Sequence, residues 1–332
     1  MKLTDKEARV IAAVELHAEL PLREIQNRTG FRSHTIRHAL GHLKQYEIIK
    51  RIVLINIRAL GYSMHNFYFS VDSDCKAQRQ ALLNVLIREP QVLSIREIGT
   101  HFQYCVGICA QSIAEVGQVV KRMTEESKVC LTKKCVSTQF ASSFLPRRYL
   151  NSRDLRDNGI CLNCPEESHR VDELDKALLQ AMSRCGDATH SALARELRIP
   201  ATTVDARIKK LEQRKIIAGY LYKVASEKYH MQSYTLLVNA RYITKQFLAK
   251  INHFSDQHPA IVQLNECFGS WDFELGLEVR LPHEVSEVIQ DLNEVLRDAI
   301  HSVKVVSNYQ EFKFTFFPVN YSKQKEVSTA VA

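Results

Sequence analysis

The sequence is poor in residues that break regular structure, and it has no long apolar runs. Among 332 residues only 11 are glycine and 8 are proline, which excludes a collagen-like or low-complexity chain. No apolar run reaches the roughly 18 residues that a membrane-spanning helix requires. The first residues, 1–7, are polar and partly acidic, unlike the apolar stretch of a signal peptide. We therefore expect a cytoplasmic protein without a membrane partner.

Common catalytic and cofactor-binding signatures are also missing. The sequence has no phosphate-binding loop, no dinucleotide-binding glycine pattern and no serine nucleophile elbow. Nine cysteines, an odd number, indicate a reducing compartment rather than a disulfide framework. Cys161 and Cys164 have the spacing of metal or redox sites, but no second such pair exists, so we interpret them as ordinary linker cysteines. The sequence predicts no enzyme, no cofactor, no catalytic residue and no metal.

Basic charge is moderate and uneven along the chain. The 45 Lys and Arg residues exceed the 37 Asp and Glu residues, which gives a net charge of +8. Residues 1–60 carry +5 and residues 171–222 carry +2, whereas residues 223–320 carry −3. A polyanionic partner would therefore be attracted to the two basic segments and repelled by the last one.

The chain repeats itself with an offset of 168 residues. Residues 3–49 align with 171–217 without a gap, and although only six positions are identical, the apolar positions superpose. The apolar spacing is helical in both copies; Ile36, Leu40 and Leu43 correspond to Val204, Ile208 and Leu211. A short break precedes the third helix of each copy, and Ser33 is expected to cap the first of these. The pattern predicts two three-helix bundles of the helix-turn-helix type.

The segments after the two bundles repeat as well. Each predicts the order β-α-β-β-α-β of a ferredoxin-like sandwich. The expected elements of the first copy are a strand at 62–72, a helix at 76–89, strands at 91–98 and 102–110, a helix at 113–126 and a strand at 128–140. Those of the second copy lie at 231–241, 244–257, 260–268, 273–280, 283–298 and 302–316. The fold class is therefore α+β.

Five motifs of the second copy, in the right order, carry a family resemblance. They are Asp172–Leu179, Ala192–Leu197, Thr203–Glu212, Ile216–Tyr220 and Gly269–Asp272. This arrangement resembles the Lrp/AsnC family of prokaryotic transcription regulators, in which a winged helix-turn-helix precedes a RAM-type ligand-binding module. The first copy departs more, because Phe102 stands near the place of the turn's Asp. The resemblance implies two fused units covering about 300 residues.

The expected organisation follows from the repeat and the resemblance together. It is a first winged helix-turn-helix (1–60), a first βαββαβ module (61–140), a linker (141–170), a second winged helix-turn-helix (171–225), a second module (226–320) and a C-terminal tail (321–332). The resemblance implies that the modules pair within one chain. It also implies a homodimer or higher homo-oligomer.

The exposed faces of the third helices are the predicted DNA-binding surfaces. At about 100° per residue, polar or small side chains lie opposite the apolar stripe in both copies. They would enter the major groove of double-stranded DNA or contact phosphates. The candidates are Ser33, His34, Thr35, Arg37, His38, Gly41 and His42 in the first copy, and Thr202, Thr203, Ala206, Arg207, Lys209 and Lys210 in the second. The alternative is that both faces are ordinary solvated helix surfaces.

Three of these histidines, His34, His38 and His42, are spaced four residues apart. The spacing would suit a metal, but no Cys or carboxylate nearby in the sequence completes a ligand set, so we do not predict one. Protonation beside phosphates would instead tighten DNA binding as the pH falls toward about 6.

A small-molecule effector, an amino acid or a related compound, is implied by the resemblance. In the family, the turns between the second and third module strands lie beside an effector cleft. The corresponding residues are Gly99, Thr100 and His101 in the first module, and Gly269, Ser270, Trp271 and Asp272 in the second. The alternative is that the glycines only satisfy tight turns and that Trp271 fills an interface.

Two other functions remain open at this stage. Siroheme decarboxylases resemble tandem Lrp/AsnC units, and their modules carry a His-Asn-Tyr-x-Arg-like stretch. His101 and Tyr104 echo it in part, but no Arg follows. The second alternative is an interaction protein whose heads no longer bind DNA. We expect a sequence-specific transcription regulator.

Overall fold

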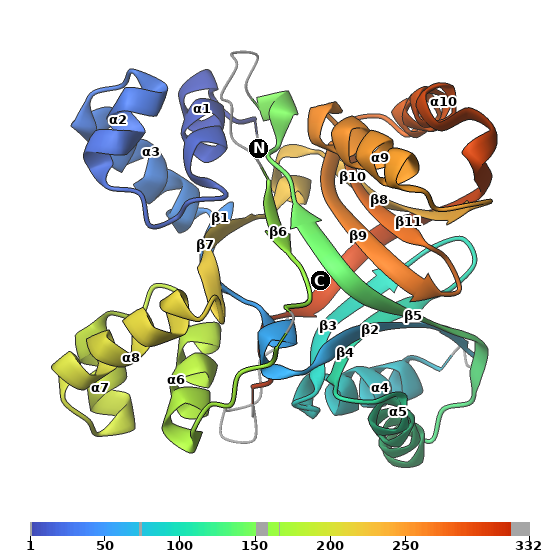
Figure 1. Ribbon diagram of the computed structural model, residues 1–332, viewed down its shortest axis with the longest axis horizontal. Coiled ribbons are helices and arrows are strands. Elements are labelled where there is room, and N and C mark those ends of the chain that lie inside the picture. Colours follow the sequence, from blue (N-terminus) through green and yellow to red (C-terminus); the bar gives the residue numbers. More distant parts are fainter. Residues whose placement is uncertain (1, 73–74, 151–158, 166, 320–332) are drawn as a thin grey trace.

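The computed structural model describes residues 2–72, 75–150, 159–165 and 167–319 (Figure 1). The tail expected at 321–332 lies outside these residues. The described residues form two helical heads and two modules of sheet and helices, so the expected α+β fold class is confirmed. No helix in this part of the chain is both long and apolar enough to span a membrane.

Each head is a bundle of three short helices. The first head contains α1 (Asp5–Val14), α2 (Leu22–Thr29) and α3 (Ser33–Gln45). The second head contains α6 (Glu173–Arg184), α7 (His190–Leu197) and α8 (Ala201–Gln213). Adding 168 moves α2 and α3 onto α7 and α8 residue for residue, so the repeat is confirmed. Ser33 is the first residue of α3 rather than its cap: the N-cap is Arg32, which makes no side-chain capping bond.

The wing strands of the two heads pair with each other. β1 (Ile49–Ile55) and β7 (Ile217–Val224) form a two-stranded antiparallel sheet in which Val53 faces Tyr220. The pairing exchanges the strands between the cores. Tyr222 and Val224 of β7 pack in the core of the first head, and Val53 and Ile55 of β1 pack in that of the second. Each head is thus completed by the wing of the other.

Both modules have the expected order of elements. The first comprises β2 (Ser63–Val71), α4 (Lys76–Arg88), β3 (Val92–Ile98), β4 (Tyr104–Ala110), α5 (Ile113–Ser127) and β5 (Leu131–Phe144). The second comprises β8 (Gln232–Ala240), α9 (Lys245–Gln257), β9 (Ile261–Gly269), β10 (Phe273–Val279), α10 (Glu284–Leu296) and β11 (Ile300–Phe314). Adding 169 to the residue numbers of the first module gives nearly the same element bounds as in the second. The bounds of β4 and α4 then coincide with those of β10 and α9. Short 3₁₀ turns, η1 (Ile57–Leu60) and η3 (Ser226–Tyr229), join each wing to its module.

The two module sheets join at both edges. β3 pairs with β11 and β5 pairs with β9, and the order β2-β4-β3-β11-β8-β10-β9-β5 closes through a β2–β5 pairing. The result is a ring of eight antiparallel strands, with α4 and α5 on one side and α9 and α10 on the other (Figure 1). Strand alternation sends one set of side chains to the helices and the other set into the ring. The modules therefore pair within a single chain.

The segment between the units is more ordered than a plain linker. β5 continues to Phe144, and β6 (Ile160–Leu162) adds a short strand beside it. A 3₁₀ turn, η2 (Arg148–Leu150), lies between them, while residues 151–158 and 166 lie outside the described part. The segment 141–170, which was expected to be a linker, therefore contains regular structure. Hydrophobic side chains explain the difference, because Leu145 and Leu162 are both buried.

Candidate functional site

The exposed face of α8 is a candidate binding surface. Val204, Ile208 and Leu211 are buried beneath the helix, as their spacing predicted. On the opposite face Thr202, Ala206, Lys209 and Lys210 are exposed, and Thr203 is half-buried. Together with Asp172 and Arg207, most of these residues line a shallow, open depression. This placement agrees with the face that the helical spacing selected.

Arg207 is placed differently from the expectation that it meets phosphates. Its Nη1 lies 2.8 Å from Asp172 and 2.6 Å from Asp175, both at the start of α6. These hydrogen bonds raise the pKa of Arg207, and the bonds from Asp175 and Arg207 lower the pKa of Asp172. Asp175 is itself buried. Arg207 therefore braces α8 against α6.

The two lysines on the exposed face of α8 differ in their pairing. Lys209 Nζ lies 2.8 Å from Asp205, and this bond lowers the pKa of Asp205. The repulsion that Asp205 would exert on a nearby phosphate is thereby reduced. The side chain of Lys210 has no hydrogen bond or ion pair with any described residue. Lys210 is thus the lysine of this face that is available to a phosphate.

The face of α3 is exposed along most of its length. Ile36, Ala39 and Leu43 form the buried stripe. His34, Arg37, His38 and Gly41 are exposed, and Ser33 and Thr35 are half-buried.

His42 turns toward the first helix instead of solvent. Its Nδ1 lies 2.6 Å from Glu7 Oε1, and its ring is tilted against that of Tyr46, with the ring centres 4.5 Å apart. Burial disfavours ionised Glu7, but hydrogen bonds from Thr4 and His42 outweigh this and lower the pKa of Glu7. Among the described residues, no group of three or more His, Cys, Asp or Glu side chains has the arrangement of a metal site. His42 therefore stabilises the packing of α1 on α3.

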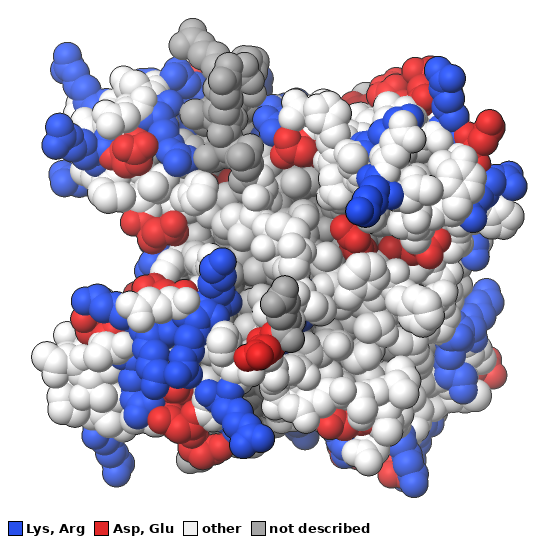
Figure 2. Space-filling view, viewed as in Figure 1, with Lys and Arg blue, Asp and Glu red and all other residues white. Residues whose placement is uncertain are grey.

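Basic side chains gather over the second head. Figure 2 shows Lys and Arg concentrated there, next to a smaller cluster of Asp and Glu. The first head carries basic side chains around its outer rim in the same view. Clustered cations beside an exposed helix are the electrostatic feature expected of a head that contacts nucleic acid.

The two turns predicted to bind an effector each form hydrogen bonds to a strand of the other module. Gly99 N donates to Ser307 O at 2.8 Å, and Thr100 Oγ1 donates to Val305 O at 2.8 Å, which joins the first turn to β11. Ser270 Oγ donates to Val136 O at 3.1 Å, which joins the second turn to β5. His101 is exposed.

Trp271 fills the interior of the strand ring. It is 3% exposed and packs edge-on against Tyr68. Asp272 accepts a hydrogen bond from Ala240 N at 2.8 Å. Gly269 adopts φ 130°, where a Cβ would lie 2.7 Å from Val136 O. These contacts match the alternative reading of the turn, in which the glycine satisfies a tight turn and Trp271 fills an interface.

A buried carboxylate inside the ring was missed from the sequence. Glu274 is 1% exposed and accepts hydrogen bonds from four side chains at 2.9–3.0 Å. The donors are Asn66, Tyr68, Gln139 and Trp271. Burial raises the pKa of Tyr68 well above its ordinary value. The signal was available in β10, where Phe273, Leu275 and Leu277 alternate with Glu274 and Glu278.

Comparison with known proteins supports a helix-turn-helix reading. A family model for winged helix-turn-helix DNA-binding matches residues 171–218. An HTH-type transcriptional regulator of Pyrococcus furiosus is 26% identical over 139 residues, which are 41% of this chain and 92% of that protein. A second, from Pyrococcus horikoshii, is 24% identical over the same lengths. An AsnC-family regulator of Agrobacterium tumefaciens matches 44% of this chain and 94% of its own, with 16% identity and a TM-score of 0.39.

A solved structure that spans nearly the whole chain is that of an enzyme. The siroheme decarboxylase NirDL matches 95% of this chain and 94% of its own, with a TM-score of 0.58 and 12% identity. It has the same two-unit fold. This finding contradicts the expectation that the chain is not an enzyme, which we withdraw. The absence of common catalytic motifs does not exclude catalysis, because the siroheme decarboxylase NirDL has this same tandem fold.

Proposed function

We propose that this chain is a sequence-specific DNA-binding transcription regulator of the tandem Lrp/AsnC type, with α8 as its principal reading helix. The observation that carries the proposal is the exposed Thr202-Ala206-Lys210 face of α8, inside the segment matched by the winged helix-turn-helix model. A helix of this kind fits the major groove of B-form DNA.

Each residue of that face has a separate role in the proposal. Thr202 and Thr203 would hydrogen-bond base edges, and Ala206 would contact a thymine methyl group. Lys210 would contact a phosphate and add affinity without sequence preference. Arg207 would hold α8 in place through Asp172 and Asp175.

The first head would read different bases. On α3, Arg37 would recognise guanine, and His34 and His38 would face the groove beside Gly41. Ser33 and Thr35 would contact the DNA backbone. His42 pairs with Glu7 and does not face the groove. Because the two faces differ, the operator would be asymmetric. The exchanged wings support this reading, since they hold the heads in one arrangement.

Regulation by a small molecule is the finer part of the proposal. An amino acid or related effector bound at the turns around Gly99 and Gly269 would change the pairing of the modules. A change there would reach the heads with a coupling of typically 1–3 kcal/mol. Assembly of two or more chains, which size-exclusion chromatography with light scattering measures, would bring further heads onto the DNA.

The experiment is selection from random-sequence duplex DNA followed by affinity measurements at two salt concentrations. Wild type should enrich one asymmetric motif with a steep salt dependence. Lys210→Ala should weaken binding to all sequences alike and reduce the salt slope by about 1. Arg37→Ala should cost about 1–3 kcal/mol on the selected motif and relax one position. Lys121→Ala, which changes an exposed lysine on α5, is the control.

Three results would contradict the proposal or a part of it. Absence of salt-sensitive affinity at low salt would leave an interaction protein without DNA contact. Equal effects of Lys210→Ala and Lys121→Ala would remove α8 from the interface. If Arg37→Ala left both affinity and preference unchanged, α3 would not be a reading helix.

A tetrapyrrole-processing enzyme is the second candidate, because NirDL shares the fold over 95% of this chain. Against it, Tyr104 of the partial motif is buried and stacks on Phe69 at 5.6 Å, so it belongs to the core. Titration with siroheme tests this candidate. A shifted Soret band and release of carbon dioxide would favour it, and an unchanged spectrum would exclude it.

A further inference from the structure

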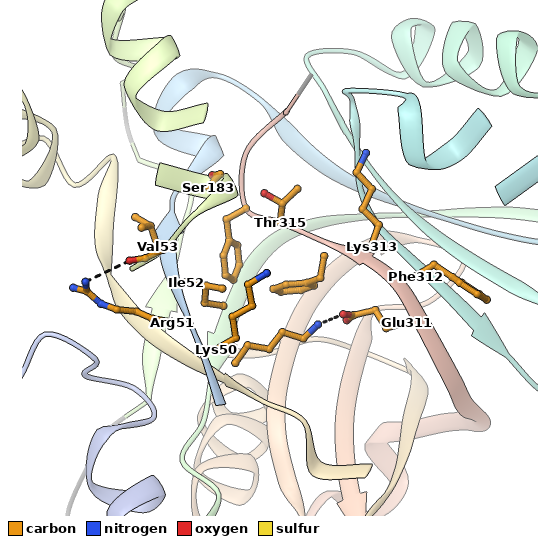
Figure 3. Close-up of a pocket in the computed structure, with 13 residues that line it drawn as sticks. Lys50, Arg51, Ile52, Val53, Ser183, Glu311, Phe312, Lys313 and Thr315 are labelled. Carbon is orange, nitrogen blue, oxygen red and sulfur yellow. Dashed lines mark hydrogen bonds and ion pairs between the residues drawn. The ribbon is translucent and has the colours of Figure 1, made fainter. Parts of the chain in front are cut away.

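A pocket of about 160 Å³ lies where both wings meet the end of the strand ring. Four elements line it: β1 with Lys50 to Val53, α6 with Ser183, β7 with Lys223, and β11 with the residues that follow it (Figure 3). It is separate from α3, from α8 and from the turns around Gly99 and Gly269. None of the sequence motifs pointed to it.

The walls of the pocket carry an excess of positive charge. Lys223 forms an ion pair with Glu311. Lys50 has no hydrogen bond or ion pair with a described residue, and Figure 3 shows its side chain in the middle of the pocket. Burial lowers the pKa of Lys223 to about 8, and the nearby charge of Lys50 adds to this effect. The two ammonium groups repel each other, so an anion between them would stabilise both.

The third lysine of the lining, Lys313, points elsewhere. Lys313 Nζ donates to Ile87 O at 2.9 Å and to Glu89 O at 2.8 Å. Its amine therefore serves the end of α4 and does not face the pocket, as Figure 3 also shows. The charge available to a ligand comes from Lys50 and Lys223, because Figure 3 shows the Arg51 guanidinium pointing away from them.

Two buried donors at the pocket lack acceptors. Arg51 Nε and Ser183 Oγ make no hydrogen bond with any described residue. Arg51 is nevertheless held in place, since Nη1 donates to Gly186 O at 3.3 Å and its guanidinium lies over Tyr220 at 4.6 Å. Buried donors without partners are rare and costly.

The opposite wall is apolar and partly aromatic. Phe314 and Phe316 pack edge to face at 5.1 Å, and Ile52 lies beside them. Lys223 Nζ stands 4.7 Å from the centre of the Phe314 ring. A pocket with a cationic side and an aromatic side selects a molecule with both characters.

We propose that this pocket binds a small aromatic carboxylate, with its carboxylate between Lys50 and Lys223, which face each other across β1 and β7, and its ring against Phe314 and Phe316. Pockets for drug-sized ligands measure about 300–1,000 Å³, so a single-ring acid matches the smaller volume here. The occupant would touch β1, β7 and β11 together, and thus both wings and the second module.

The test is isothermal titration calorimetry of the full chain with three probes. Phenylacetate carries both features, phenylacetamide lacks the charge, and inorganic phosphate lacks the ring. Phenylacetate should bind saturably with one site per chain. Phenylacetamide should bind at least about tenfold more weakly because it lacks the charge that strengthens a hydrogen bond to an ammonium group. Phosphate should also bind at least about tenfold more weakly because it leaves the aromatic wall uncovered.

Variants locate the site. Lys50→Gln should weaken phenylacetate binding about tenfold without disturbing the fold, because Lys50 is exposed and makes no contact of its own. Lys121→Gln, on the far side of a module, should bind as wild type does. Four results would overturn the proposal: no binding of phenylacetate, equal binding of phenylacetamide, equal binding of phosphate, or an equal effect of the two variants.

Discussion

Arg147 joins the first head to the second module, and replacing it tests how tightly these parts are coupled. Its guanidinium lies 2.8 Å from Glu15 at the end of α1 and 2.8 Å from Glu278 on β10. Its backbone N also donates to Glu15, at 2.5 Å. The side chains of Glu15 and Glu278 are only 1% and 7% exposed. The perturbation is Arg147→Met, which keeps an unbranched apolar stem and removes the charged guanidinium.

The expected cost follows from the burial of the two carboxylates. Removing one partner of a buried ion pair typically costs about 3–5 kcal/mol, because the remaining charge is left without compensation. Here one substitution leaves two carboxylates, so we expect the upper part of that range. Tyr149 still donates to Glu278 and relieves part of the loss there.

The loss should depend on pH. Burial already raises the pKa of Glu15, although Arg147 opposes the shift. A carboxyl group with a raised folded pKa stabilises the folded state at low pH and loses this contribution as the pH rises through that pKa. Without Arg147 the pKa of Glu15 rises further. The free energy of unfolding of Arg147→Met should therefore fall below wild type by more at pH 8 than at pH 5.

Urea unfolding at pH 5 and pH 8, followed by circular dichroism, measures both effects. Arg148→Met is the matched control, because the neighbouring Arg148 pairs with Asp256 at 3.2 Å with side chains 22% and 28% exposed. Such a solvent-accessible pair contributes about 0–1 kcal/mol. Equal losses in the two variants, or an Arg147→Met loss independent of pH, would refute the reasoning.

Three further variants test the ring and its seams. Glu274→Leu leaves four buried donors without an acceptor, so we expect a loss of about 3–5 kcal/mol and a shifted emission of Trp271, the single tryptophan. Gly269→Ala places a Cβ against Val136 O in a left-handed backbone, and the thermal midpoint should fall by the equivalent of about 1–3 kcal/mol. Burial lowers the pKa of Lys313 to about 7. The unfolding free energy of wild type should then rise with pH between about 7 and 10.5, and urea titrations of Lys313→Met should lack this slope.

The regular elements followed from the sequence because their apolar spacing is clear. Helices such as α4 and α9 lie within one or two residues of the prediction, since their caps and flanking turns are local features. The exposed face of α8 was also predicted, because Val204, Ile208 and Leu211 fix its rotation. Arg207 and His42 were misplaced. Their partners, Asp172 and Glu7, sit on another helix of the bundle, which a helical projection does not show.

Long-range pairing was the part that the sequence did not reveal. The exchange of wings depends on β1 meeting β7, whose paired residues are 162 to 175 positions apart, and no local pattern distinguishes this from two separate wings. The ion pairs of Arg147 and the pocket at Lys50 likewise join residues that are far apart in the sequence. Both lie where several elements converge, so neither has a sequence signature.

The fused chain allows an asymmetry that a symmetric pair of single units would not tolerate. With the offset of 169, Glu274 corresponds to Cys105, and both face the interior of the ring. In a symmetric dimer a carboxylate at this position would occur twice in one buried space, where like charges are costly. Here the second position holds a thiol, which Arg96 contacts at 3.3 Å. One carboxylate can therefore gather four donors from both modules, and the single copy of Glu274 fixes the register in which the two modules join.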